Sequence, residues 1–193
     1  MNDKDSKIRF TFDEDKFYAV MLILAKKTSR LDALKAAKLL YLADRDHLRA
    51  HGKPILGDSY VAMEYGPVPS LSYDILKNIR SGIVTNALLR VERQSGHQYP
   101  VFVAIVEPEL DYLSQTEMES IDKIIDEYGN NLGTDLVNIT HKHKTWTESK
   151  ENLLEGADPI DYRLFFSEQS EDCQQAFDVM IMEQEDRDFA TGL

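Results

Sequence analysis

The chain has 193 residues, of which 42% are hydrophobic and 29% charged, and its formal net charge is −12. These values are typical of a soluble globular protein, and the length is sufficient for one hydrophobic core. No stretch offers the roughly 18 apolar residues that a membrane-spanning helix needs. The sequence therefore predicts a single domain over residues 1–193 without a membrane span.

The amino-terminal residues and the single cysteine narrow the protein class further. The first ten residues are charged and no apolar run follows them, which argues against a secretory signal or a transit peptide. Cys173 is the only cysteine, so it has no partner for an internal disulfide and no second thiol for a zinc site. We expect a cytoplasmic protein.

The negative charge is concentrated at the carboxyl-terminal end. Residues 148–193 contain 13 acidic and 3 basic residues, which accounts for −10 of the net charge. Such a region repels phosphate backbones, so nucleic-acid binding by this chain alone is not favoured, whereas a basic partner would be attracted. The alternative interpretation is that these acids keep terminal helices solvated. Residues 148–193 are predicted to be an acidic helical extension of a core at 13–147.

The amino-terminal part is predicted to consist of two helices. Thr11 and Glu14 resemble a capping box, and apolar residues then recur at helical spacing, which predicts a helix over 13–27. A second helix is predicted over 31–51. Its centre, AAKLLYLA, is apolar around most of its circumference, which indicates burial on more than one side. Gly52 is expected to end it.

Short strands and a third helix are predicted next. Residues 59–64 fit a short strand, and 66–69 fit a stiff loop because two prolines fix their own φ angles. A helix follows over 70–80, and two strands, 88–93 and 99–106, form a hairpin. A two-stranded ribbon is marginally stable alone, so it must pack on helices or pair with the first strand.

Helices are predicted through the rest of the chain. Ser114 and Glu117 form a capping box for a helix that ends at Gly129. Three local signals predict further helices: apolar side chains within 135–143, the Asp158-Pro159 pair ahead of a brief helix through Phe166, and Ser170 ahead of a final helix. The expected fold class is α+β, mainly α-helical, a compact helical domain with a small antiparallel β-hairpin or three-stranded sheet.

Groups suited to chemistry are sparse. Asp44, His47 and His51 lie near one face of the second helix and suggest a metal site, which would imply a metal-dependent enzyme. The general-base Glu of the HExxH motif is missing and no fourth ligand is evident, so a solvated helix end is the favoured interpretation. Nucleophile-elbow, phosphate-loop and dinucleotide motifs are absent. The sequence predicts no catalytic, cofactor-binding or metal-binding residue.

Two other features of the central part bear on partners. Lys35 and Lys38 belong to a basic stripe on the second helix that interspersed acids balance, which does not favour a DNA-reading helix. Three tyrosines flank the Gly-Pro turn, and aromatic side chains near a rigid loop suit protein–protein contact, although packing beneath the hairpin is the alternative. The candidate partner-binding residues are Tyr60, Tyr65, Pro67 and Tyr73.

Several short stretches share the pattern of one known family. They are Lys38–Asp44 (KLLYLAD), Gly52–Ile55 (GKPI), Gly57–Tyr60 (GDSY) and Tyr65–Val68 (YGPV), with Tyr73 following, and a weaker block from Leu136 through Ile139-Thr140-His141 to Trp146. Over roughly residues 17–147 the chain resembles the SocA-like antitoxin family, also called the Panacea domain, of bacterial toxin–antitoxin pairs and prophage genes. The family usually has Leu and often Pro where this chain has Ile139 and Thr145.

The resemblance implies a mainly helical domain with a small β element that neutralises diverse toxins, generally by direct binding. At least one relative delivers its toxin to a protease. Because partners vary while the domain persists, we interpret the shared residues as scaffold: Tyr41, Asp44, Gly52, Gly57, Gly66, Pro67, His141 and Trp146. The hairpin or the acidic end is then expected to select the partner.

The expected function is that of a non-enzymatic antitoxin, which binds a cognate protein toxin and uses its acidic end where that toxin is basic. The alternatives are a proteolytic adaptor, a phage-encoded modulator of a host protein and, more distantly, a metal-dependent enzyme.

Overall fold

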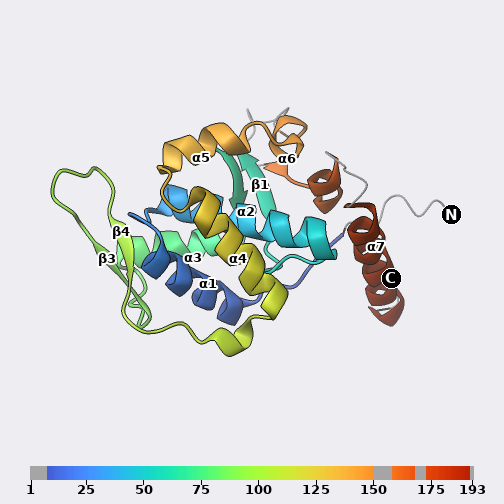
Figure 1. Cartoon of the computed structure of the whole chain (residues 1–193), viewed down its shortest axis with the longest axis horizontal. Helices are drawn as coiled ribbons and strands as arrows, with labels where there is room; N and C mark the ends of the chain where they lie inside the picture. The colour runs from blue at the N-terminus through green and yellow to red at the C-terminus, as the bar shows by residue number, and fades with distance from the viewer. Residues whose placement is uncertain (1–7, 150–157, 168–172, 192–193) are drawn as a thin grey trace.

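The computed structural model describes residues 8–149, 158–167 and 173–191. The fold class is α+β and mainly helical, as predicted (Figure 1). The helices are α1 (Glu14–Lys27), α2 (Ala33–His51), α3 (Ser70–Ser81), α4 (Gln115–Tyr128), α5 (Gly133–Thr140), α6 (Lys144–Thr147) and α7 (Gln174–Thr191), with 3-10 helices η1 (Leu110–Tyr112) and η3 (Tyr162–Phe166). The strands are β1 (Tyr60–Met63), β2 (Gly66–Pro69), β3 (Leu89–Glu92), β4 (Val101–Ala104) and β5 (Asp158–Pro159).

Helix α2 lies at the centre of the molecule and contacts α4, α5, α7 and β2 (Figure 1). Leu39, Leu40 and Tyr41 are fully buried, in agreement with the predicted apolar circumference. The helix ends at Gly52 in the left-handed conformation, as expected. Helix α7 crosses so closely that a Cβ atom at this glycine would lie 2.5 Å from the Ala176 carbonyl oxygen. The helix stop is therefore also the contact point for the carboxyl-terminal helix.

The amino-terminal caps differ in how well they were predicted. Asp13, not Thr11, caps α1, because its carboxylate accepts a hydrogen bond from the Lys16 amide at 3.0 Å. The capping box of α4 is confirmed, with Ser114 and Glu117 bonded to each other's backbone amides. The Lys16 ammonium group lies 2.5 Å from the Glu117 carboxylate, so the two helix starts are joined by an ion pair.

A three-stranded antiparallel sheet has the order β2-β1-β5. The loop predicted for residues 66–69 is wrong: these residues form β2, in a register that runs from Tyr60 opposite Pro69 to Met63 opposite Gly66. Prolines are tolerated here because β2 is an edge strand, where a missing N–H does not interrupt a ladder on both sides.

The helix start predicted at Asp158-Pro159 is also wrong. These two residues form β5, and the amide of Ile160 donates to the Tyr60 carbonyl at 2.8 Å. The short helix begins later as η3, where the Asp161 carboxylate accepts from the Arg163 amide. Pairing with β1 overrides the local cap signal, since it supplies the backbone partners that a helix start would otherwise provide.

The predicted hairpin is present as β3 and β4, which project beside α1 and α3 (Figure 1). Its pairing with the first strand, one of two alternatives, is wrong. The hairpin is instead supported by helices, and the Phe102 amide donates to the Leu31 carbonyl just before α2 at 2.8 Å. Phe102 itself is buried in the core.

The bounds of the remaining helices differ from the predicted ones where the structure describes them. The helix expected over 135–143 is α5, which begins at Gly133 and ends at Thr140, and Trp146 belongs to the separate α6. Ser170, the expected start of the final helix, lies outside the described residues, and α7 is described from Gln174. Within the described ranges, no helix is both long enough and apolar enough to cross a membrane.

Helix α3 is capped from a distant part of the chain. It has no side-chain cap of its own, but the buried Asp58 carboxylate accepts hydrogen bonds from the amides of Leu71 at 2.9 Å and Ser72 at 2.8 Å. The Ser72 hydroxyl donates to the same carboxylate at 2.6 Å. Asp58 thus fixes the start of α3 against the segment that leads to β1.

Replacing Asp58 by Ala should lower the free energy of unfolding by about 2–4 kcal/mol, because three donors lose their acceptor and two are helix amides. The matched control is Asp161→Ala at the exposed cap of η3, which should cost less than about 1 kcal/mol. Urea unfolding followed by circular dichroism measures both variants. Equal losses would contradict the capping role of Asp58.

Candidate functional site

Three polar residues, Lys38, Tyr41 and Asp44, lie along one face of α2. They are spaced three residues apart, which places them on the same side of the helix, and all three are buried. This face contacts β2, which carries part of the sequence motif, and η3, which lies outside the motif. We call these three residues the α2 polar row.

Lys38 extends beneath β2. Its ammonium group donates to the Pro67 carbonyl at 2.7 Å. Burial lowers the pKa of Lys38 to about 7, because the charged form is poorly solvated inside the protein. Lys35 is likewise buried and donates to the Gly129 carbonyl at 2.6 Å. The basic stripe inferred from the sequence is therefore in part an internal set of lysines that bond to backbone carbonyls.

Asp44 holds the turn between α2 and β1. One carboxylate oxygen accepts from the amides of Ile55 at 2.9 Å and Leu56 at 2.8 Å, and the other accepts from the Tyr60 hydroxyl at 2.9 Å. Burial raises the pKa of Asp44 to about 7, and these hydrogen bonds oppose the rise. The carboxylate fastens two backbone amides and one buried tyrosine to the helix.

His47 and His51 do not combine with Asp44 into a metal site. The His47 Nδ1 atom lies 2.7 Å from the Lys53 carbonyl and so donates to it, while Nε2 lies 3.1 Å from the Thr116 hydroxyl. His51 is exposed, and its ring lies tilted against that of His47 at 4.6 Å between ring centroids. Within the described residues, no three His, Cys, Asp or Glu side chains are grouped to hold a metal.

The second motif block packs against the first. The His141 ring stacks on Trp146 at 3.7 Å between centroids and an interplanar angle of 6°, and the Trp146 indole N–H donates to the Met63 carbonyl at 2.9 Å. The Tyr41 hydroxyl lies 2.6 Å from the Thr145 hydroxyl and 3.0 Å from the His143 Nδ1 atom. The segment from α5 to α6 therefore closes over the α2 polar row and β1.

Glycines permit this close packing. At Gly66, φ is +97° and an added Cβ would lie 2.9 Å from the Thr140 hydroxyl and 3.0 Å from the Lys38 ammonium group. At Gly57 an added Cβ would lie 2.3 Å from the Thr11 carbonyl oxygen. Both positions thus exclude larger side chains.

A comparison with protein families places the chain. A family model described as "Antitoxin SocA-like, Panacea domain" matches residues 37–147. The chain belongs to the SocA-like antitoxin family. The match runs from α2 to α6 and so includes the α2 polar row and both motif blocks, whereas α1, η3 and α7 lie outside it. Searches of curated proteins and of solved structures found no match.

The four candidate partner-binding residues differ in exposure in this Panacea domain. Tyr65 lies at the turn between β1 and β2 with 59% of its surface exposed, and Tyr73 on α3 is half-buried. Tyr60 and Pro67 are buried. A contact between a partner and any of the four residues stays a prediction.

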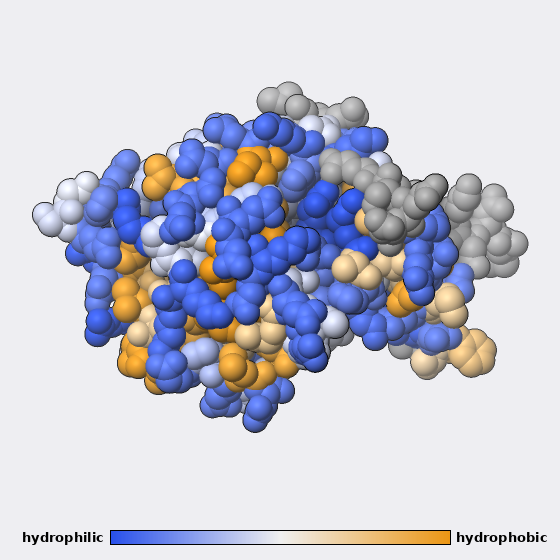
Figure 2. Space-filling view, in the orientation of Figure 1, coloured by the Kyte–Doolittle hydropathy of each residue, from blue (hydrophilic) through white to orange (hydrophobic). Residues whose placement is uncertain are grey.

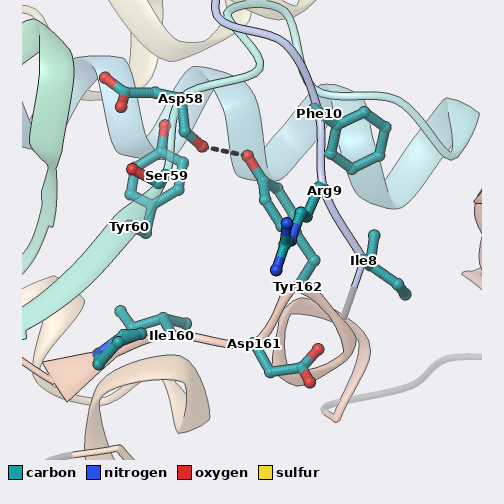
Figure 3. A pocket seen from close by; sticks show the side chains of 10 residues that line it. Ile8, Arg9, Phe10, Asp58, Ser59, Tyr60, Ile160, Asp161 and Tyr162 are labelled. Atoms are coloured by element: carbon teal, nitrogen blue, oxygen red, sulfur yellow. Dashed lines mark hydrogen bonds between the residues drawn. The ribbon is translucent and has the colours of Figure 1, made fainter. Parts of the chain in front are cut away.

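A cavity of about 560 Å³ lies beside β1, between the amino-terminal segment and the start of η3 (Figure 3). The Tyr162 hydroxyl donates to the Asp58 carbonyl in its wall, and the Asp58 carboxylate points away from Tyr162 toward α3. The Tyr60 hydroxyl is bonded to Asp44. Arg9 and Asp161 are exposed at the cavity. Its buried polar groups therefore brace the fold and do not form a nucleophile–base pair.

Sequence reasoning missed the burial of Lys38 and the capping role of Asp58. The signal for Lys38 was present, since a lysine in the fully apolar centre of a buried helix must find an internal acceptor. The partner of Asp58 lies 13 residues later and carries no local cap signal, so only the tertiary contact identifies it.

Gly66→Ala should lower the free energy of unfolding by about 3 kcal/mol, because the left-handed backbone is strained and the new methyl group overlaps two polar atoms. Gly82→Ala is the matched control: φ there is +74° and nothing lies within 4 Å of an added Cβ. It should cost only about 1 kcal/mol. Thermal and urea unfolding measure both, and equal losses would show that the packing at Gly66 is loose.

Lys38 should make stability depend on pH above neutrality. Its pKa is about 7 in the folded protein, against an ordinary value of 10.5 for lysine. Between these pH values the unfolded chain binds more protons than the folded protein, so the free energy of unfolding rises as pH rises. This gain in stability is lost as pH falls toward 7. The variant Lys38→Met should lack this rise.

The measurement is urea unfolding from pH 8 to 9, about one unit above the pKa of Asp44 and about one unit below that of ordinary tyrosines. Lys77→Met on the exposed face of α3 is the control and should keep the rise. The same pH slope in the wild type and in Lys38→Met would contradict the internal position of the amine.

Proposed function

We propose that this protein is an antitoxin-type binding protein, not an enzyme, and that it neutralises a cognate toxin by direct contact. The proposal depends on one observation. The polar motif residues Lys38 and Asp44, within the matched antitoxin-family region, form hydrogen bonds inside the protein. A catalytic group must reach the substrate, whereas Lys38 and Asp44 are buried and bonded to backbone. The motif residues therefore stabilise a rigid scaffold, and we expect exposed residues elsewhere to contact the partner.

The carboxyl-terminal helix is one candidate surface. Exposed acidic residues on α7 include Asp178, Glu185 and Asp186, and two apolar side chains, Met182 and Phe189, are also exposed. Charged groups at the edge of an interface accelerate encounter with an oppositely charged partner more than they strengthen the complex. This arrangement favours a toxin with a basic surface.

The same helix is packed on the core, which supports our proposal of a single domain over 1–193 with a core at 13–147 and an acidic extension at 148–193. Gly52 contacts the α7 backbone at Ala176, and the Arg49 guanidinium donates to the Phe165 carbonyl at 2.6 Å. Removing α7 would expose the end of α2, so charge substitutions are better tests than deletions.

Co-expression with the product of the neighbouring gene tests the function. The wild-type chain should restore growth of cells that express a toxic neighbour, and the purified proteins should form a complex. If the complex does not form and growth is not restored, the proposal fails for that pair. Toxin that persists at full level during rescue supports direct blocking, whereas toxin loss that depends on a protease indicates an adaptor.

The triple variant Asp178→Asn/Glu185→Gln/Asp186→Asn should slow association with that toxin by about tenfold at low salt, because electrostatic steering is reduced. The control variant Glu119→Gln/Asp126→Asn/Glu127→Gln changes the same charge on α4. Stopped-flow association at two salt concentrations measures both. An association rate equal to that of the wild type would remove α7 from the proposed interface.

A further inference from the structure

A shallow groove of about 120 Å³ lies between α1 and the segment that leads from β4 to α4. Two tyrosines, Tyr18 and Tyr112, line it together with the apolar side chains of Leu22, Leu88 and Val106. Tyr112 is 44% exposed and Tyr18 is half-buried, so the ring of Tyr112 is open to a ligand. We call this feature the α1–η1 groove.

Exposed apolar side chains extend the groove along the chain. Ile105 and Leu110 are exposed, and they are the sequence neighbours of Val106 and Glu109 in the groove lining. Apolar residues gather on the lower part of the view in Figure 2, where Figure 1 shows η1 and the segment after β4. Where exposed apolar side chains adjoin a groove, they commonly mark a binding surface.

Carboxylates form the rim. Asp15, Glu107 and Glu109 line the groove. Glu107 is paired with Lys26, whereas no ion pair of Asp15 or Glu109 is found among the described residues. The Glu109 carboxylate, followed by that of Asp15, raises the pKa of Tyr112, because both carboxylates lie near its hydroxyl group. The rim therefore selects for positive charge.

We propose that the α1–η1 groove binds an arginine side chain of the partner protein, presented between apolar residues. A guanidinium group is planar, so it can stack on the Tyr112 ring while it donates to the Glu109 or Asp15 carboxylate. The aliphatic part of the side chain packs on Leu22 and Val106. Flanking apolar residues of the partner cover Ile105 and Leu110. The identity of the partner as a toxin rests on the proposed function.

A peptide titration tests the groove without any knowledge of the toxin. The probe is a blocked peptide with an arginine between two leucines, added to the isotope-labelled full chain, and its control carries neutral citrulline in place of arginine. Saturable NMR shifts are expected at Tyr18, Leu22, Val106 and Tyr112. The citrulline peptide should bind about tenfold more weakly, since it lacks the charge. No saturable shift, or equal binding of both peptides, would overturn the inference.

Variants assign the effect to the rim and the ring. Asp15→Asn/Glu109→Gln should weaken arginine-peptide binding about tenfold, whereas Glu119→Gln/Asp126→Asn, with the same charge change on α4, should leave it unchanged. Tyr112→Ser should weaken binding and Tyr112→Phe should retain it, because the ring is the contact. Circular dichroism checks that each variant is folded. Undiminished binding by Asp15→Asn/Glu109→Gln would also overturn the inference.

The same variants separate this inference from the proposed function. If the wild type neutralises the neighbouring toxin and Asp15→Asn/Glu109→Gln binds that toxin equally well, the groove is not the docking site and the antitoxin function stands. If the wild type does not bind the product of the neighbouring gene, the proposed function fails for that pair. The peptide titration alone then decides whether the groove binds arginine.

Discussion

The buried carboxylate of Asp44 is the interaction on which most of the structure depends. It accepts from two consecutive backbone amides, Ile55 and Leu56, and from the Tyr60 hydroxyl, so it fixes the chain where α2 turns into β1. An unpaired donor at this depth would cost about 1–3 kcal/mol, and three are satisfied by one side chain. Once β1 is placed, β2 and β5 can pair on its two sides.

Other buried polar side chains of α2 also form hydrogen bonds to neighbouring elements. Lys38 holds β2 through the Pro67 carbonyl, and Tyr41 lies within hydrogen-bond distance of Thr145, so one helix face organises elements from both motif blocks. Buried polar groups of this kind are costly unless they are satisfied, and they restrict the core to one arrangement. A scaffold fixed from inside leaves its outer surfaces free to vary.

Much of the fold could be predicted from the sequence because the signals were local. The capping box at Ser114, the stop at Gly52 and the hairpin around β3 and β4 each depend on neighbouring residues. The failures at 66–69 and at Asp158-Pro159 have a common cause. Proline chemistry indicates a turn or a helix start, but pairing with β1 decides between strand and loop. For Asp158-Pro159 this partner strand is distant in the chain, whereas for 66–69 it is the preceding strand, and the prolines are compatible with pairing only because β2 lies at the sheet edge.

By itself the sequence determined the mainly helical class, the resemblance to the SocA-like antitoxin family and the concentration of acid at the carboxyl-terminal end, since these follow from periodicity, motif and composition. Only the tertiary structure decided which motif residues are buried, that Asp58 caps α3 and that Tyr18 and Tyr112 share a groove with Asp15 and Glu109. Burial and long-range contact arise from how distant segments pack, and no local pattern encodes that packing.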